Sequence, residues 1–271
     1  MKPLYILKIG GSVATFKDEA GGSVRLELLE KIALAIKKIQ AKKDFSLVLV
    51  HGAGSVGHNL ARKHELDKGT NGDKKKLQNA LFTCVANQEM DNMIAKIFLF
   101  NGIKAFPVHT ASTIIQKNKK ISYCNTEIIK QILEKDCVPV LYGEMVMDFD
   151  LEMSVCSGDA IVAYLAKHLG AQKIFFASDI DGVFDKDPYF NKDAKLIEKT
   201  KLSEIFNDDK IEITHSHNVD VTGGMLGKIR SLEAECGNAL QTIEIFNGLK
   251  EENYEKIFSG KKFPHTTIKN K

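Results

Sequence analysis

The stretch from Phe45 to Leu60, FSLVLVHGAGSVGHNL, constrains the fold more than any other part of this chain. It contains four consecutive aliphatic residues, Leu47–Val50, which are typical of a strand buried on both faces. Three glycines follow within six residues, and the sequence from Ala61 onward predicts a helix. His58 stands at the start of that helix. Because a helix that follows a glycine turn presents free N–H groups, the stretch predicts a binding site for an anion.

The spacing Gly52-x-Gly54-x-x-Gly57 also matches the fingerprint of dinucleotide-binding folds. That alternative needs a second strand that ends in an acidic residue about 20 residues further on. The segment Asp67–Lys76, DKGTNGDKKK, is instead a polar loop. The chain also lacks the GxxxxGK[ST] P-loop, so an ATP site here must have another design.

Strand and helix patterns alternate along the chain. Strands are predicted at Leu4–Ile9, Leu47–Val50, Ala105–His109, Val138–Tyr142, Lys173–Ala177 and Gln241–Phe246, with a hairpin at Glu144–Val155 and an edge strand at Thr266–Ile268. Helices are predicted at Leu26–Ala41, Lys75–Asn101, Thr126–Lys135 with Thr126 as N-cap, Ser157–Leu169 and Tyr254–Phe258.

This alternation predicts an α/β fold, a three-layer αβα sandwich around a mostly parallel sheet. With no low-complexity linker in 271 residues, we expect one domain. The most natural boundary inside it lies near Val155. It separates an N-terminal lobe, residues 1–155, from a C-terminal lobe, residues 156–271.

Four turns rich in glycine lie where a predicted element leads into a helix. They are Gly10-Gly11-Ser12, Gly52–Gly57, Gly158-Asp159 and Gly223-Gly224. In a parallel sheet such turns meet at one edge, where ligands bind. Four of them favour an anion-rich ligand over plain connections.

Charged side chains accompany these turns. Lys8, Lys17 and Lys228 suit a moving phosphoryl group, whose transfer needs positioning and cancellation of charge. Lys8 lies inside an apolar strand, whereas Lys17 taken alone is typical of a solvated surface. Asp159 either caps its helix or pairs with these lysines. Asp179 and Asp181 are candidates for contact with a ribose or, indirectly, with magnesium.

Other histidines and the long helix favour structural interpretations. A His51–His58–His64 metal site is rejected because no single helix face supplies that spacing, and His51 and His64 are interpreted as ordinary. The helical pattern at Lys75–Asn101 carries an apolar stripe that is more typical of a core than of a pocket. Its members are Leu77, Leu81, Val85, Met90, Met93, Ile94, Ile97 and Phe98.

Composition excludes several classes of partner. The net charge of +3, with lysines spread along the chain, does not favour nucleic acid. The five cysteines are odd in number and lack CxxC spacing, so reduced thiols in the cytoplasm are expected. No apolar run approaches the roughly 18 residues of a membrane-spanning helix, and no signal-peptide layout precedes Leu4.

Five motifs in order resemble the amino acid kinase family over almost the whole chain. LKIGGSVATFK resembles its first loop, and HGAGSVGH resembles its HGGGSFGH, which is the most specific of the five. YGEMVMDFDLEMSVCSGDAI resembles its hairpin and SGDD turn, and SDIDGVFDKDP and DVTGGMLGK resemble its nucleotide-side loops. The resemblance is closest to members that phosphorylate isopentenyl phosphate.

The resemblance implies the fold of that family and the ATP-dependent conversion of isopentenyl phosphate to isopentenyl diphosphate, with Mg²⁺ and in a homodimer. It implies that Lys8, Lys17 and Lys228 stabilise the transferred γ-phosphoryl group. His58 would hydrogen-bond the acceptor phosphate, and Asp159 would organise the lysines. Acceptor contacts are implied for Ala53, Gly54, His58 and Gly158. Nucleotide contacts are implied for Lys8, Gly10, Gly11, Ser12, Gly54, Asp179, Asp181, Gly182, Lys186, Gly224 and Lys228.

Two residues depart from the family pattern, and three alternatives stay open. Ala53 replaces a glycine, and Ala160 replaces the second aspartate of SGDD. A fosfomycin-type phosphonate kinase would share the loop and His58. A carboxylate kinase, such as one acting on acetylglutamate, should not need His58. A non-catalytic nucleotide-binding protein is disfavoured because all three lysines are present.

Overall fold

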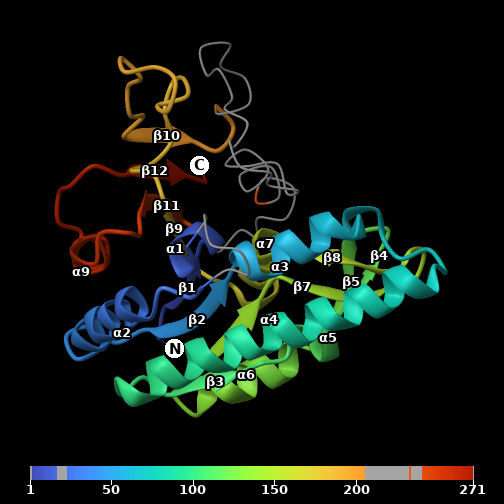
Figure 1. The fold of residues 1–271 in the computed structure, drawn as a ribbon. Coiled ribbons are helices and arrows are strands. Elements are labelled where there is room, and N and C mark those ends of the chain that lie inside the picture. The colour runs from blue at the N-terminus through green and yellow to red at the C-terminus, as the bar shows by residue number, and fades with distance from the viewer. Residues whose placement is uncertain (1, 17–22, 205–231, 233–239, 271) are drawn as a thin grey trace.

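The computed structural model describes residues 2–16, 23–204, 232 and 240–270 (Figure 1). Its larger sheet has eight strands in the order β10-β12-β11-β9-β1-β2-β6-β3, and all neighbouring pairs are parallel except β11 with β12. The strands are β1 (Leu4–Ile9), β2 (Ser46–His51), β3 (Ala105–Pro107), β6 (Val138–Tyr142), β9 (Lys173–Ser178), β10 (Lys199–Lys201), β11 (Thr242–Asn247) and β12 (Thr266–Lys269).

A smaller sheet of four strands lies beside the first, in the order β5-β4-β7-β8. It consists of β4 (Ile114–Lys117), β5 (Lys120–Cys124), β7 (Glu144–Asp148) and β8 (Glu152–Cys156). The predicted hairpin is confirmed as the antiparallel pair of β7 and β8. Strand β4 was not anticipated. Its pairing with β7 depends on residues distant in sequence, which no local pattern reveals.

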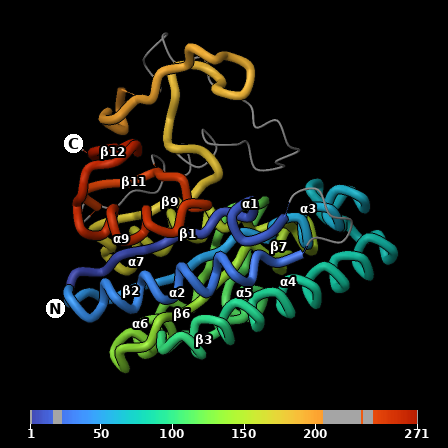
Figure 2. The backbone as a smooth tube through the Cα atoms, turned by 60° about the vertical axis from the view of Figure 1, so that its left-hand side comes forward, coloured from blue at the N-terminus to red at the C-terminus, as the bar shows by residue number. Residues whose placement is uncertain are grey.

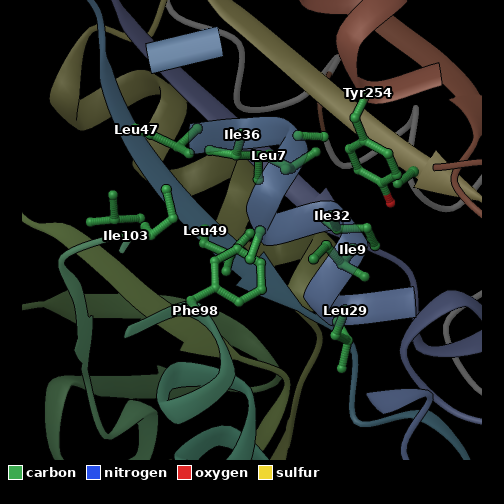
Figure 3. Packing of buried hydrophobic residues seen from close by; sticks show 14 of the residues in the cluster. Leu7, Ile9, Leu29, Ile32, Ile36, Leu47, Leu49, Phe98, Ile103 and Tyr254 are labelled. Carbon is green, nitrogen blue, oxygen red and sulfur yellow. The ribbon is translucent and has the colours of Figure 1, made fainter. Parts of the chain in front are cut away.

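Helices cover both faces of the larger sheet because side chains alternate along each strand. Leu7, Leu47 and Leu49 face a core with α2 (Leu26–Gln40), α4 (Lys74–Phe100) and α9 (Glu252–Ser259), as Figure 3 shows for Leu7, Ile36 and Phe98. Ile6, Val48 and Val50 face the opposite core, with α6 (Thr126–Glu134) and α7 (Gly158–Leu169). The three-layer α/β sandwich around a mostly parallel sheet is confirmed.

In the part of the chain that the structure describes, the other helical segments are α1 (Gly11–Ala14), α3 (Gly54–Lys63), the 3₁₀ turn Leu66–Lys68 and α5 (Thr110–Thr113). Figure 2 shows α3 near one end of the long helix α4, which runs from there towards β3. None of the described helices combines the length and the apolar character that crossing a bilayer requires.

Three local predictions are wrong. Helix α3 begins at Gly54 rather than Ala61, so His58 lies in its second turn. The N-cap of α6 is Asn125, whose side chain accepts from the backbone N–H of Ile128, and not Thr126. Strand β12 is not at the edge of the sheet, because β10 pairs along its outer side.

Helix α4 is confirmed, but its apolar residues do not form one buried stripe. Met90, Ile94 and Phe98 are buried, whereas Leu81, Val85 and Met93 are exposed. The buried face instead includes the polar residues Thr83, Asn87 and Asp91, spaced four apart. This spacing puts all three on the side of the helix that faces the sheet.

Candidate active site

Two glycine turns contact each other directly at the carboxyl ends of β1 and β2. A Cβ atom on Gly11 would lie 2.7 Å from the Cα of Gly54, and one on Gly52 would lie 2.7 Å from the N atom of Gly11. Real Cβ atoms do not approach backbone so closely, so any side chain here would separate the two turns. Gly54 also has φ of +57°, a region that other residues rarely adopt.

The third turn reaches the same place from the smaller sheet. A Cβ on Gly158 would lie 3.2 Å from both the backbone oxygen of His51 and the Cε of Lys8. The N atoms of Ala53 and Gly158 both lie within 4 Å of the point that a Gly143 Cβ would occupy. The sequence predicts a common sheet edge, and the structure forms it from two sheets rather than one.

The converging turns offer unpaired N–H groups. Among the described residues, the backbone N–H groups of Ala53, Gly54 and Gly158 donate to no protein acceptor. No side chain caps the start of α3. The segment that follows the glycine turn after β1 supports the start of α3 instead, because the N–H of Ser55 donates to Thr15 Oγ1 at 3.0 Å. Free N–H groups at the start of a helix are suited to phosphate oxygens.

Lys8 and Asp159 form a buried ion pair at this edge. Lys8 points to the α7 face of the sheet because its neighbours Leu7 and Ile9 point to the other face. The Nζ of Lys8 donates to Oδ1 of Asp159, and both side chains are about 5% exposed. Ser157 is the N-cap of α7, through the N–H of Ala160 at 3.1 Å. Asp159 therefore does not cap its helix and instead faces the lysine.

His58 lies on α3, immediately after Gly57, and is half-buried. Gly57 is required because a Cβ there would clash with Asn87 Oδ1 and with the Cβ of Ala53. Because α3 packs so closely on α4 here, the contact sets the position of His58 relative to the turn Gly52–Gly57.

The nucleotide-side residues predicted from the sequence occupy the loop after β9. Asp179 directly follows that strand, and Asp181 accepts from Lys250 Nζ at 3.1 Å. Gly182 packs against Thr266, and Lys186 pairs with Asp193. Gly10, Gly11 and Ser12 lie at the end of β1, where the N–H of Gly10 donates to the oxygen of Ala177 at 2.9 Å. Lys17, Gly224 and Lys228 fall outside the described residues.

The sequence analysis missed a buried polar cluster on the α4 side of the same turn. His51 Nε2 lies 3.1 Å from Asp91 Oδ1, and its ring stacks on Tyr142 with centroids 5.4 Å apart. Asn87 Nδ2 donates to Glu144 Oε1 at 2.9 Å. The sequence pattern that could have revealed this cluster is the four-residue spacing of Asn87 and Asp91 among the apolar residues of α4.

Burial dominates the electrostatics of this cluster. It raises the pKa of Glu144 to about 8, although hydrogen bonds from Asn87 and the N–H of Met145 act in the opposite direction. Glu144 is therefore largely protonated at neutral pH. Burial likewise raises the pKa of the Cys84 thiol to about 12, so this cysteine is not a nucleophile. No group of three or more His, Cys, Asp or Glu side chains in the described ranges is arranged to hold a metal ion.

Comparison with known proteins gives a consistent family. The sequence model of the amino acid kinase family matches residues 3–247. Isopentenyl phosphate kinase from Methanothermobacter thermautotrophicus is 31% identical over 99% of this chain and 100% of its own length. Isopentenyl phosphate kinase from Methanocaldococcus jannaschii is 32% identical over 95% of each chain.

The fold agrees with these relatives. A crystal structure described as "X-ray structures of isopentenyl phosphate kinase" superposes with a TM-score of 0.79 and 28% identity. The alignment covers 98% of this chain and all of that one.

Proposed function

Because the chain belongs to the amino acid kinase family, we propose that it transfers the γ-phosphoryl group of ATP to isopentenyl phosphate, giving isopentenyl diphosphate and ADP. The observation that carries the proposal is the meeting of three glycine turns, two of which carry free N–H groups, beside the buried Lys8–Asp159 pair. Two full-length relatives with the name isopentenyl phosphate kinase support the choice of acceptor.

We assign the acceptor phosphate to the N–H groups of Ala53, Gly54 and Gly158. His58 donates a hydrogen bond to this phosphate and orients its oxygen for attack. A small buried cluster of Ala61, Leu66, Ala80, Met145 and Met153 packs between α3, α4 and the hairpin. Small and flexible apolar side chains suit a short hydrocarbon tail.

We assign the nucleotide to the C-terminal lobe, residues 156–271, and the acceptor to residues 1–155. The nucleotide contacts are Gly10, Gly11, Ser12, Gly54, Asp179, Asp181, Gly182, Lys186 and Gly224, together with Lys8 and Lys228. Mg²⁺ enters with the phosphates of ATP, since magnesium in such sites is held largely by phosphate oxygens.

The chemistry that these residues supply is positioning and charge cancellation. The attacking and leaving oxygens lie in line across the transferred group, whose charge Lys8, Lys17 and Lys228 stabilise. Asp159 keeps Lys8 at the edge of the sheet rather than in solvent. We place this activity in isoprenoid synthesis by a mevalonate pathway and, on the basis of the free cysteines Cys84, Cys124, Cys137 and Cys156, in the cytoplasm.

A second candidate function is the phosphorylation of a phosphonate. It is favoured by the buried polar pair of Asn87 and Glu144, of which Asn87 packs against Gly57 and would suit a more polar acceptor. A phosphonate presents the same oxygens to the turn and to His58.

The test is release of ADP in a coupled assay with isopentenyl phosphate, dimethylallyl phosphate and a panel of phosphonates. We expect turnover with isopentenyl phosphate and at least a hundredfold loss in His58→Ala, with little change in the matched variant His64→Ala at the end of α3. Turnover of phosphonates alone would favour the second candidate. ATP binding without turnover of any acceptor would instead support a non-catalytic nucleotide-binding protein.

We also propose a homodimer formed through the exposed face of α4. Leu81, Phe82, Val85, Met93 and Phe100 leave apolar surface on this face. If two copies cross antiparallel about Asn92 and Met93, Glu89 lies opposite Lys96 of the partner subunit, and Val85 lies opposite its Phe100. Apolar contact and opposite charges then coincide, as in a self-complementary twofold interface.

A further inference from the structure

We propose that His51, held by Asp91, is a positioning residue that turns the Gly52–Ala53 peptide so that its N–H faces the acceptor phosphate. The identity of the acceptor rests on the proposed function. The orientation of the Ala53 N–H is argued from distances between described residues.

The first step is the position of the imidazole ring. His51 ends β2, and its side chain points to the α4 face, opposite to that of Val50. It is 0% exposed, and its Nε2 lies 3.1 Å from Oδ1 of Asp91, itself 2% exposed. The ring stacks on Tyr142, with the two planes 12° apart. Asp91 of α4 therefore holds one edge of the imidazole, and Tyr142 of β6 packs against its face.

The second step is the contact that this fixed ring makes. The Nδ1 atom of His51 lies 3.1 Å from the carbonyl oxygen of Gly52. A carbonyl accepts and cannot donate, so Nδ1 carries the proton. On its other edge the ring lies against Asp91, which holds the imidazole in this orientation.

The third step follows from the planarity of the peptide bond. In a trans peptide the C=O and N–H groups point in opposite directions. Because His51 draws the Gly52 carbonyl towards α4, the N–H of Ala53 must point away from α4, towards Gly143 and Gly158. The N atom of Ala53 lies 3.7 Å from the point that a Gly143 Cβ would occupy, and Gly158 N lies 3.1 Å from it. This N–H has no protein acceptor in the described part of the chain.

Glycine at position 52 itself restricts the orientation of the Gly52–Ala53 peptide very little, so the hydrogen bond from His51 supplies that restriction. A Cβ there cannot be accommodated, because Gly11 lies 2.7 Å away. Without a side chain, the Gly52 backbone explores more orientations than any other residue would. A hydrogen bond from a rigid, buried ring restores the single orientation in which Ala53 can bind an anion.

A matched pair of variants separates this role from plain packing. In His51→Asn the amide NH₂ takes the position of Nδ1, so it still donates to the Gly52 carbonyl but no longer contacts Asp91. In His51→Gln the amide reaches the position of Nε2, so it still donates to Asp91 but no longer contacts the Gly52 carbonyl. Asp91→Asn keeps a polar partner for Nε2 and a protonated Nδ1. His168→Gln on the exposed side of α7 is the control.

We expect His51→Gln to weaken the binding of isopentenyl phosphate and of inorganic phosphate about tenfold, measured by calorimetry and by ³¹P NMR. In His51→Asn and Asp91→Asn, the loss of affinity for these phosphates should be at least threefold smaller than in His51→Gln. The affinity for ATP should stay within twofold of the unmodified protein in all variants. In ¹⁵N NMR, phosphate should shift the Ala53 amide of the unmodified protein and shift it much less in His51→Gln.

Equal losses in His51→Asn and His51→Gln, or a parallel loss of ATP affinity, would overturn the proposal. So would an Ala53 amide that does not respond to phosphate in the unmodified protein. If isopentenyl phosphate is not phosphorylated at all, the proposed function fails, and the titration with inorganic phosphate still decides the role of His51.

Discussion

At the scale of single residues, the Lys8–Asp159 pair is the most consequential contact. A buried charge is tolerated when its partner is adjacent, and removing one partner leaves the other uncompensated. The pair crosses from the central strand β1 to the start of α7, 151 residues away in sequence. It therefore links the two halves of the chain at the point where we place the reaction.

Lys8→Met should lower kcat at least a hundredfold, because it removes a cation from the transferred group. It should also lower the free energy of unfolding by about 3 kcal/mol, because Asp159 stays buried without its partner. Steady-state kinetics and chemical denaturation measure the two effects. Lys2→Met, which removes exposed ion pairs with Asp44 and Asp136, is the control. A kcat within threefold of the original would contradict the proposed role.

Glu144 makes a second prediction at this scale. Its pKa of about 8 lies above the value of 4.5 for a free glutamate. Between these pH values the folded protein keeps a proton that the unfolded chain has lost, so its stability falls as pH rises. Glu144→Gln removes this dependence. Its stability relative to the unmodified protein should therefore rise between pH 5 and pH 8, by on the order of 3 kcal/mol.

Denaturation at several pH values measures this difference, with the exposed Glu134→Gln as the control. A difference that is constant with pH would show that Glu144 is ionised in the folded protein.

At the scale of elements, the packing of α3 on α4 depends on a glycine inside a helix. Gly57→Ala adds a Cβ that meets Asn87 Oδ1 and lies 2.6 Å from the Ala53 Cβ. We expect it to destabilise the protein by about 1–3 kcal/mol, since neither neighbour can move freely. Combining it with Asn87→Ala should cost less than the sum of the two single changes. Denaturation of the three variants tests this, and strict additivity would argue against the contact.

The same helix shows where sequence reasoning succeeds and fails. Strands such as β1, β2 and β9 were predicted within one or two residues because continuous aliphatic runs have few alternatives. The glycines of α3 delayed its predicted start to Ala61, because glycine disfavours helices unless packing requires it. Only the proximity of Asn87 explains Gly57, and that proximity comes from tertiary structure.

At the scale of the whole molecule, the exposed face of α4 predicts the state of assembly. Val85 and Phe100 are 54% and 80% exposed, and we expect a second copy to cover them. Val85→Lys combined with Phe100→Lys should convert a dimer to a monomer in sedimentation equilibrium. Leu34→Lys, at an exposed position on α2, is the matched control. A monomeric unmodified protein at micromolar concentration would refute the interface.

The site as a whole was predictable where one motif carries several functional residues. Lys8, the glycine turns and Asp159 could be named because each lies next to a turn of recognisable sequence. His51, Asp91 and Glu144 could not, because each looks ordinary within its own element. Their significance arises only when β2, α4 and β7 meet.

The direct contact between the backbones of Gly11 and Gly54 has one more consequence. If one turn carries the donor and the other the acceptor, the gap that the phosphoryl group crosses is set by two main chains and not by adjustable side chains. Exchange of the residues that surround the acceptor tail would then alter which molecule is phosphorylated without changing the distance over which the phosphoryl group is transferred. A scaffold of this kind can diversify in its choice of substrate while the reaction itself is conserved.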